Sequence, residues 1–218
     1  MFPTELHAKL KETAIIAVLV IDDAKQAVPL AKCLLRGGVD AMELTLRTDA
    51  ALDALRAIRQ EVPDMLAGIG TILTTQQIDG VVGAEAAFGV APGLNRSVVE
   101  YAQDKGLPFG PGIATPSDIE RGLELGCRTL KFFPAETSGG LAHLKSMAGP
   151  YQHLGIDFIP LGGLNAQNMN SYIASPLISA IGGSWIAKRD LIVASNWDQI
   201  EVNAREARQI VEATRGQD

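Results

Sequence analysis

Thr129-Leu130-Lys131-Phe132-Phe133 is a short, mostly apolar run that holds one lysine, and Pro134 follows it. Its β-branched and aromatic residues, ended by a proline, predict a buried β-strand. Seven further runs of this kind occur, at intervals of roughly 20 to 28 residues, the length of one strand–helix unit with short loops. The eight predicted strands are 14–20, 41–46, 66–71, 87–91, 108–113, 129–133, 158–161 and 180–183.

Helix signals separate these predicted strands. Thr115 and Asp118 have the spacing of a helix N-terminal cap. We expect a short leading helix over 4–11 and a closing helix over 198–214, where apolar residues recur at helical spacing. The alternation of strands and helices predicts an α/β fold, a (β/α)8 (TIM) barrel that forms a single domain over 1–218. An open, doubly wound sheet is the alternative, but no glycine-rich fingerprint follows the first strand.

The composition is that of an acidic globular protein. The 218 residues carry a formal net charge of −6, and hydrophobic residues make up 47% of them, so a largely disordered chain is excluded. No basic cluster suits DNA or RNA, and we expect no nucleic-acid partner. The apolar runs are short and broken by glycine or charge, so we expect no membrane span.

The cysteines and histidines match no metal-binding pattern. Cys33 and Cys127 are far apart, and the three histidines are scattered. We therefore expect no metal site and no cofactor. The N-terminus lacks a basic region followed by an apolar stretch, so no secretion signal is predicted. Free cysteines without such a signal favour a cytoplasmic location.

Lys131 is the residue of greatest chemical interest. An ammonium group in a buried strand costs several kcal/mol to desolvate unless it is paired or loses its proton. Buried lysines are the usual nucleophiles of Schiff-base chemistry. A structural alternative is a lysine whose stem packs in the strand while its charged head reaches water.

Polar side chains on two other predicted strands can face Lys131. Alternation along the second strand gives Glu43, Thr45 and Arg47 one parity. Thr71 ends the third strand and shares its parity with Ile69. If the polar groups point toward a common axis, Glu43 is a candidate acid–base group. Arg47 and Thr71 are then candidates to bind a substrate carboxylate.

Other functions fit the same residues. A buried ion pair of Glu43 with a lysine or arginine has a purely structural explanation. A sugar-phosphate isomerase or epimerase that uses Glu43 as its base is a second enzyme class on a similar barrel. A non-catalytic barrel that binds a phosphorylated ligand is a third hypothesis.

Glycine pairs end the last two predicted strands. Gly162-Gly163 follows the seventh strand, and Gly182-Gly183 ends the eighth, with Ser184 directly after it. Barrels often bind phosphate at these two positions through backbone N–H groups. We predict that Gly162, Gly163, Gly183 and Ser184 bind phosphate. Tight turns that need positive φ are the alternative explanation for the glycines.

Motifs along nearly the whole chain resemble those of the 2-keto-3-deoxy-6-phosphogluconate (KDPG) aldolases. The motifs are AMELTLR at 41–47, GIGTIL at 68–73, APGLN at 91–95, PGIATPSD at 111–118, KFFPAE at 131–136, AGP at 148–150, LGGL at 161–164 and IGGSW at 181–185. They occur in the family's order. KFFPAE together with GGSW is a specific combination.

The resemblance implies a class I aldolase on a (β/α)8 barrel, a homotrimer that works without a metal. Its reaction would be the cleavage of a keto-deoxy sugar acid phosphate to pyruvate and glyceraldehyde 3-phosphate. The same resemblance assigns the roles that follow by position: Lys131 as the Schiff-base lysine, Glu43 as general acid–base, Arg47 and Thr71 as carboxylate ligands, Pro92 and Phe133 as pocket walls, and Gly162, Gly163, Gly183 and Ser184 as phosphate ligands.

Two positions depart from the family's pattern. Leu161 stands where a threonine commonly precedes the glycine pair, and Ala91 stands where a serine commonly precedes the proline. Both changes remove hydroxyl groups near the expected position of substrate hydroxyls, so Leu161 becomes an apolar wall of the pocket. A polar site discriminates between substrate hydroxyls more strongly than an apolar one. 4-Hydroxy-2-oxoglutarate cleavage and oxaloacetate decarboxylation, which use the same lysine and enamine, are alternative activities in related enzymes.

Overall fold

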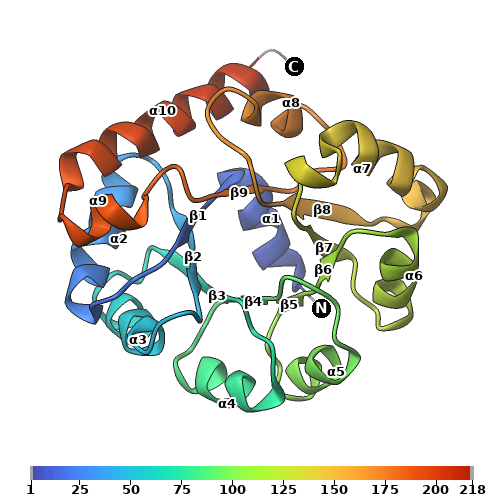
Figure 1. Cartoon of the computed structure of the whole chain (residues 1–218), viewed down its shortest axis with the longest axis horizontal. Helices are drawn as coiled ribbons and strands as arrows, with labels where there is room; N and C mark the ends of the chain where they lie inside the picture. Colours follow the sequence, from blue (N-terminus) through green and yellow to red (C-terminus); the bar gives the residue numbers. More distant parts are fainter. Residues whose placement is uncertain (1, 217–218) are drawn as a thin grey trace.

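The computed structural model describes residues 2–216, in which parallel strands curl around a centre with helices on the outside (Figure 1). The strands are β1 (Ile15–Leu19), β2 (Ala41–Thr45), β3 (Leu66–Gly70), β4 (Gly89–Val90), β5 (Phe109–Gly110), β6 (Gly112–Ile113), β7 (Thr129–Phe132), β8 (Asp157–Pro160) and β9 (Ile181–Gly183). The predicted α/β class is confirmed. The ends of the predicted domain, residues 1 and 217–218, lie outside the described residues.

Helices connect most of these strands. The α-helices are α1 (Thr4–Thr13), α2 (Ala27–Arg36), α3 (Ala51–Glu61), α4 (Thr75–Gly83), α5 (Arg96–Asp104), α6 (Pro116–Glu124), α7 (Gly140–Ala148), α8 (Met169–Ile173), α9 (Arg189–Val193) and α10 (Trp197–Arg215). Three 3-10 helices are η1 (Ala24–Gln26), η2 (Glu136–Ser138) and η3 (Gly149–Leu154). The predicted leading and closing helices form as α1 and α10. Thr115 and Asp118 cap α6 reciprocally, as their spacing predicts.

The strands pair in two groups, with the orders β5-β4-β3-β2-β1-β9 and β6-β7-β8. Single parallel bridges join Phe158 to Ile178 and Leu161 to Gly182, next to β8 and β9. The expectation of one continuous fifth strand over 108–113 is wrong. Pro111 separates β5 from β6, because proline has no N–H to donate to a strand ladder.

Side chains of the long strands alternate between the inside of the curled sheet and the helix layer. Met42 and Leu44 belong to the large apolar cluster that packs against the helices. Ala41 belongs to a smaller cluster on the inner side. Because successive side chains of a strand point to opposite faces, Glu43 and Thr45 point inward, as the assigned parity predicts.

Helix α1 covers the amino ends of the strands. Leu10 is fully buried in the inner cluster, and Phe2 and Leu6 pack against it. His7 pairs with the carboxylate of Asp157, the first residue of β8. These contacts fill the amino end, so space for a ligand is left at the carboxyl ends of the strands.

Candidate active site

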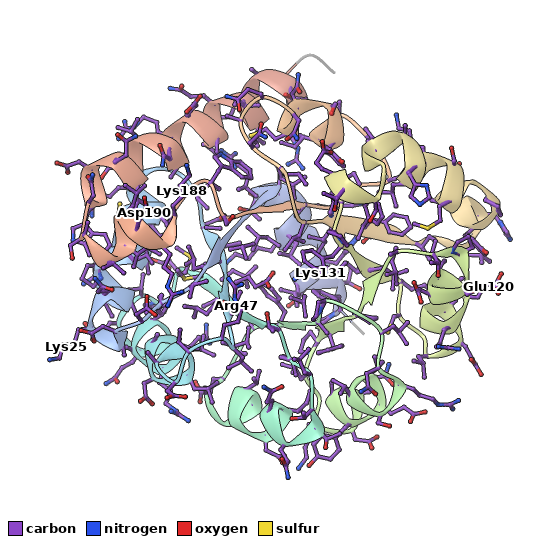
Figure 2. All side chains as sticks on the ribbon, in the orientation of Figure 1. Lys25, Arg47, Glu120, Lys131, Lys188 and Asp190 are labelled. Atoms are coloured by element: carbon purple, nitrogen blue, oxygen red, sulfur yellow. The ribbon has the colours of Figure 1, made fainter. Side chains whose placement is uncertain are left out.

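A cavity of about 200 Å³ lies at the carboxyl ends of the strands. Its lining residues are Val18, Glu43, Thr45, Arg47, Thr71, Pro92, Lys131, Phe133, Leu161, Gly162, Gly182 and Ser184. In Figure 2 Lys131 and Arg47 lie within the circle of strands, whereas Lys25 and Glu120 lie at the outer surface of the molecule. The fold therefore brings most of the predicted site residues to one place.

Lys131 and Glu43 form a buried ion pair in this cavity. Lys131 Nζ donates to Glu43 Oε1 at 3.0 Å and lies 3.4 Å from Oε2. The two side chains are only 7% and 2% exposed. Nζ also lies 5.6 Å from the centre of the Phe133 ring, whose π electrons attract a cation. The predicted amine and the predicted proton carrier are thus in direct contact.

Gly70 makes the room that the Glu43 carboxylate occupies. A Cβ atom at Gly70 would lie 1.7 Å from Glu43 Oε1, so any other residue would displace the carboxylate. Gly68, two residues earlier, leaves room in the same way for the Phe88 ring. Neither glycine is among the predicted site residues, although glycines two apart in a predicted strand indicate a close approach from one side.

Arg47 and Thr71 reach the cavity by different routes. Arg47 lies beyond the end of β2 and is exposed at the cavity rim, where its Nε donates to Thr45 Oγ1 at 3.3 Å. Thr71 follows the last residue of β3 and has a φ of 64°, which is rare for a β-branched residue. The shared parity of Thr71 and Ile69 is not what places Thr71, because Ile69 packs in the helix-side cluster. The turn of the backbone after Gly70 does so.

The other side of the cavity carries few polar side chains. Leu161, Gly162 and Ser184 line it, together with Gly182. Gly163 and Gly183 are not among the lining residues. A Cβ atom at Gly163 would lie 2.6 Å from Glu136 Cβ, and one at Gly183 would lie 1.5 Å from the Trp185 ring. Close packing therefore explains these two glycines, and their part in phosphate binding stays a prediction.

The chain matches known proteins over most of its length. Residues 6–203 match the family model "Aldolase: KDPG and KHG aldolase". A 2-dehydro-3-deoxy-phosphogluconate aldolase from Haemophilus influenzae is 42% identical over 207 residues, 95% of this chain and 97% of the relative. The chain belongs to the KDPG and KHG aldolase family. The family resemblance drawn from the motifs is confirmed.

Two solved structures of KDPG aldolases share the fold. The enzyme of Legionella pneumophila, with pyruvate captured as a covalent carbinolamine intermediate, is 36% identical with a TM-score of 0.86, over 91% of this chain and 96% of that one. The enzyme of Zymomonas mobilis ZM4, with 3-phosphoglycerate, is 35% identical with a TM-score of 0.84, over 94% and 96%. Both resemble this chain nearly from end to end.

Further side chains belong to the site or stand close to it. Thr45 and Val18 line the cavity, and neither is among the predicted site residues, although Thr45 has the parity of Glu43. Glu136 is not among the lining residues of the cavity and accepts a hydrogen bond from Tyr172. Burial, and then this bond, raise the pKa of the Tyr172 hydroxyl above its ordinary value. Tyr172 therefore stays protonated and serves as a structural donor.

Within residues 2–216, no three side chains of histidine, cysteine, aspartate or glutamate gather as metal ligands do. None of the helices in this part of the chain is both long enough and apolar enough to cross a bilayer.

Proposed function

We propose that the protein is a class I aldolase that cleaves 2-keto-3-deoxy-6-phosphogluconate to pyruvate and glyceraldehyde 3-phosphate through a Schiff base on Lys131. The observation that carries the proposal is the contact of 3.0 Å between Lys131 Nζ and Glu43 Oε1 inside the cavity. Family membership supports it, as does the covalent carbinolamine of pyruvate in a relative of the same fold.

The first half of the reaction forms an imine. Lys131, as the neutral amine, adds to the C2 carbonyl of the keto acid and gives a carbinolamine. Before the addition, Glu43 takes the proton of the Lys131 ammonium group. It then relays one proton from nitrogen to the carbonyl oxygen, which becomes the carbinolamine hydroxyl, and gives up its own proton as that hydroxyl leaves as water. The product is an iminium ion that links Lys131 to C2. Its positive charge can accept the electrons of the bond that breaks next.

The second half of the reaction breaks the C3–C4 bond, protonates C3 and releases pyruvate. A base removes the proton of the C4 hydroxyl, the C3–C4 bond breaks, and C4 leaves as the aldehyde carbon. The bonding electrons form an enamine between C2 and C3 and neutralise the iminium. A proton from Glu43 then adds to C3, and water hydrolyses the resulting imine to pyruvate and free Lys131. One carboxyl group thus serves several proton transfers.

The remaining cavity residues bind the two ends of the substrate. Arg47 and Thr71 hold the carboxylate next to C2, where the guanidinium group offers paired donors. Pro92, Phe133 and Leu161 form the walls. On the far side the phosphate lies against the residues predicted for it, which are Gly162, Gly163, Gly183 and Ser184. Two of these, Gly162 and Ser184, line the cavity.

Reduction with borohydride in the presence of pyruvate tests the proposal. The expected result is a pyruvyl adduct on Lys131, mapped by mass spectrometry after digestion. Lys25, which lies at the outer surface, provides the control, because Lys25→Ala should form the same adduct. An adduct on another lysine, or none, would contradict the mechanism. It would also revive the isomerase and ligand-binding hypotheses.

A second activity, the cleavage of 4-hydroxy-2-oxoglutarate, is favoured by the apolar wall at Leu161. This side chain is 4% exposed and presents no hydroxyl group to a sugar chain. Oxaloacetate decarboxylation needs only the same imine and enamine. Ratios of kcat/KM for the three compounds decide between them, and a clear preference for the phosphorylated sugar acid is expected.

We also infer the architecture and assembly that such an enzyme would have. With β5 and β6 as one interrupted strand, the sheet closes as a (β/α)8 barrel, and the bridge between Leu161 and Gly182 supports this closure. The whole chain then forms one domain. The family resemblance favours a homotrimer, which light scattering would detect, and the free cysteines fit the predicted cytoplasmic location.

A further inference from the structure

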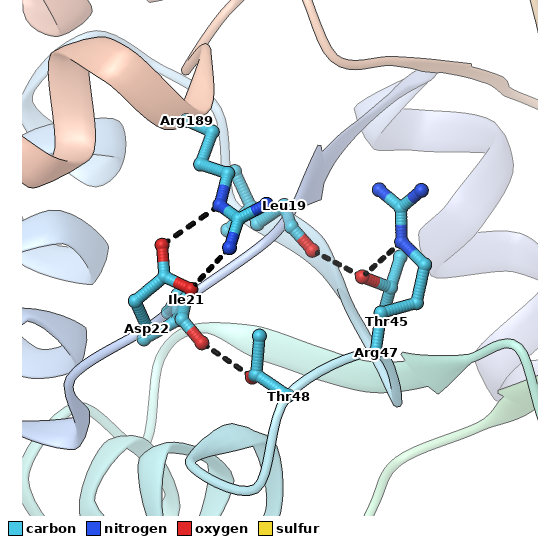
Figure 3. A network of polar contacts seen from close by, with 7 residues as sticks. All are labelled: Leu19, Ile21, Asp22, Thr45, Arg47, Thr48 and Arg189. Atoms are coloured by element: carbon cyan, nitrogen blue, oxygen red, sulfur yellow. Dashed lines mark hydrogen bonds and ion pairs between the residues drawn. The ribbon is translucent and has the colours of Figure 1, made fainter.

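Thr45 lies between the end of β1 and the guanidinium group of Arg47 (Figure 3). Its hydroxyl group donates to the carbonyl of Leu19 at 3.0 Å and accepts from Arg47 Nε at 3.3 Å. The residue is 5% exposed and lines the cavity. We propose that Thr45 is a positioning residue that orients Arg47 for the carboxylate of the substrate.

The direction of the two hydrogen bonds supports this role. A hydroxyl group has one hydrogen to donate, and a carbonyl oxygen can only accept. The hydrogen of Thr45 therefore points to Leu19, and a lone pair faces Arg47 Nε. The guanidinium group is bound through Nε, and in Figure 3 its two terminal nitrogens point away from Thr45. Those nitrogens can present paired donors to a carboxylate.

The acceptor at Leu19 is itself held in place. Leu19 pairs with Leu44 in the ladder between β1 and β2. After β1, Thr48 donates to the carbonyl of Ile21. Arg189 donates two hydrogen bonds, of 2.8 and 2.6 Å, to the Asp22 carboxylate. The segment from Leu19 to Asp22, whose Leu19 carbonyl binds Thr45, is thus tied to β2, to the loop after β2 and to α9 (Figure 3).

An arginine at an exposed rim needs such a support. Arg47 makes no ion pair with any residue between 2 and 216, and an arginine side chain loses considerable rotamer freedom when it is ordered. A bond at Nε made before the substrate arrives reduces the freedom that binding must remove. The effect should therefore appear in the affinity for the carboxylate and not in the chemical step.

The inference rests on the proposed function, since it needs pyruvate to bind at Lys131. Thr45→Val keeps the shape of the side chain and removes both hydrogen bonds. The concentration of pyruvate that gives half-maximal trapping by borohydride should rise about three- to tenfold, the usual weight of one hydrogen bond. The amount trapped at saturation should match the unmodified protein. Thr45→Ser should restore the original value, because it keeps the hydroxyl group.

Two controls separate positioning from a general loss of structure. Thr214→Val removes a side-chain hydrogen bond from α10, outside the cavity, and the half-maximal concentration of this variant should not change. Acetone resembles pyruvate but has no carboxylate, so trapping with acetone should not respond to Thr45→Val. Equal effects on both compounds would overturn the proposal. Thr45→Ala replaces Thr45→Val if circular dichroism shows that the valine variant does not fold.

The decisive test combines Thr45→Val with Arg47→Ala. If Thr45 acts through Arg47, the threonine substitution should have no further effect once the guanidinium group is gone. The same three- to tenfold rise in that background would overturn the inference, as would an unchanged value in Thr45→Val alone. Failure of the proposed function looks different, because the unmodified protein would then form no adduct on Lys131.

Discussion

Two buried carboxylates with nitrogen partners lie at opposite ends of the curled sheet, and their surroundings differ. At the amino end, Asp157 pairs with His7 and also accepts from Ser179 Oγ at 3.2 Å. At the carboxyl end, Lys131 pairs with Glu43. Both pairs are mostly buried, with side-chain exposures of 26% and 12% for His7 and Asp157, and 7% and 2% for Lys131 and Glu43.

The two pairs differ in what lies beside them, which is a helix at the amino end and a cavity at the carboxyl end. Helix α1 carries His7 and packs over the amino end. The Asp157 carboxylate is therefore bound by His7 and Ser179 and covered by this helix. Lys131 faces a cavity of about 200 Å³ and, within residues 2–216, bonds through Nζ to Glu43 alone. A buried amine with a single partner and free space beside it can react with a ligand once it has given its proton to that partner. The comparison predicts that the two ends can be damaged independently.

Replacement of Lys131 should have the largest effect. Lys131→Met removes the nucleophile, and aldol cleavage should fall by at least about 1,000-fold. The variant should also lose about 3–5 kcal/mol of stability, because Glu43 is left buried without a partner. Lys131→Met combined with Glu43→Gln should recover most of that stability and stay inactive. Kinetics and denaturant unfolding check both statements, and Lys25→Met is the matched control. Retained cleavage in Lys131→Met would show that the pair at the carboxyl end is not the reactive one.

Damage at the amino end should cost stability and leave catalysis intact. Asp157→Asn keeps the shape of the side chain but removes the charge that faces His7, and the free energy of unfolding should fall by about 1–3 kcal/mol. The value of kcat at 25 °C should not change. Asp104→Asn, at an exposed aspartate near the end of α5, should alter neither quantity. A large loss of kcat in Asp157→Asn would show that the two ends are coupled.

A smaller effect is expected from the wall of the cavity. Leu161→Thr places a hydroxyl group where Leu161 now packs over Gly182, and it should raise the discrimination between C4 epimers of the sugar acid by about tenfold. Leu161→Val has the shape of threonine without the hydroxyl group, so it should not reproduce the change. The ratio of kcat/KM for the two epimers measures the effect. An unchanged ratio in Leu161→Thr would show that this residue does not contact the C4 hydroxyl.

The smallest effect concerns Cys127, which lies just before β7 at the closed end. Burial raises its pKa and that of Cys33, so at pH 8 both remain largely as unreactive thiols. Iodoacetamide should modify neither while the protein is folded, and both after unfolding in guanidinium. Mass spectrometry counts the labels. Rapid labelling of the folded protein at Cys127 would mean that the amino end is open.

Local patterns were sufficient to predict the elements and the identity of the central pair. The apolar run around Lys131 predicts β7, and the spacing of Thr115 and Asp118 predicts the start of α6. Alternation predicts that Glu43 shares a face with Thr45. Each of these depends on residues within a few positions of one another, which is why the sequence suffices.

Long-range contacts explain what the sequence analysis missed. Pro111 breaks a predicted strand, yet only the pairing partners show that β5 and β6 join different ladders. Thr71 reaches the cavity through a positive φ, and Gly70 is needed because the Glu43 carboxylate lies against it. Neither fact can be read from neighbouring residues, because each depends on strands that come together only in the folded chain.

Periodicity, caps and motifs are local, so the amino-acid sequence predicts the α/β class, the order of the elements, the family and the candidate side chains for the proposed imine chemistry. The tertiary structure decided which of those side chains meet. It places Lys131 3.0 Å from Glu43 and ties Arg47 to Thr45, while it turns Glu136 toward Tyr172. Strand register and packing set these distances, and both are properties of the assembled sheet.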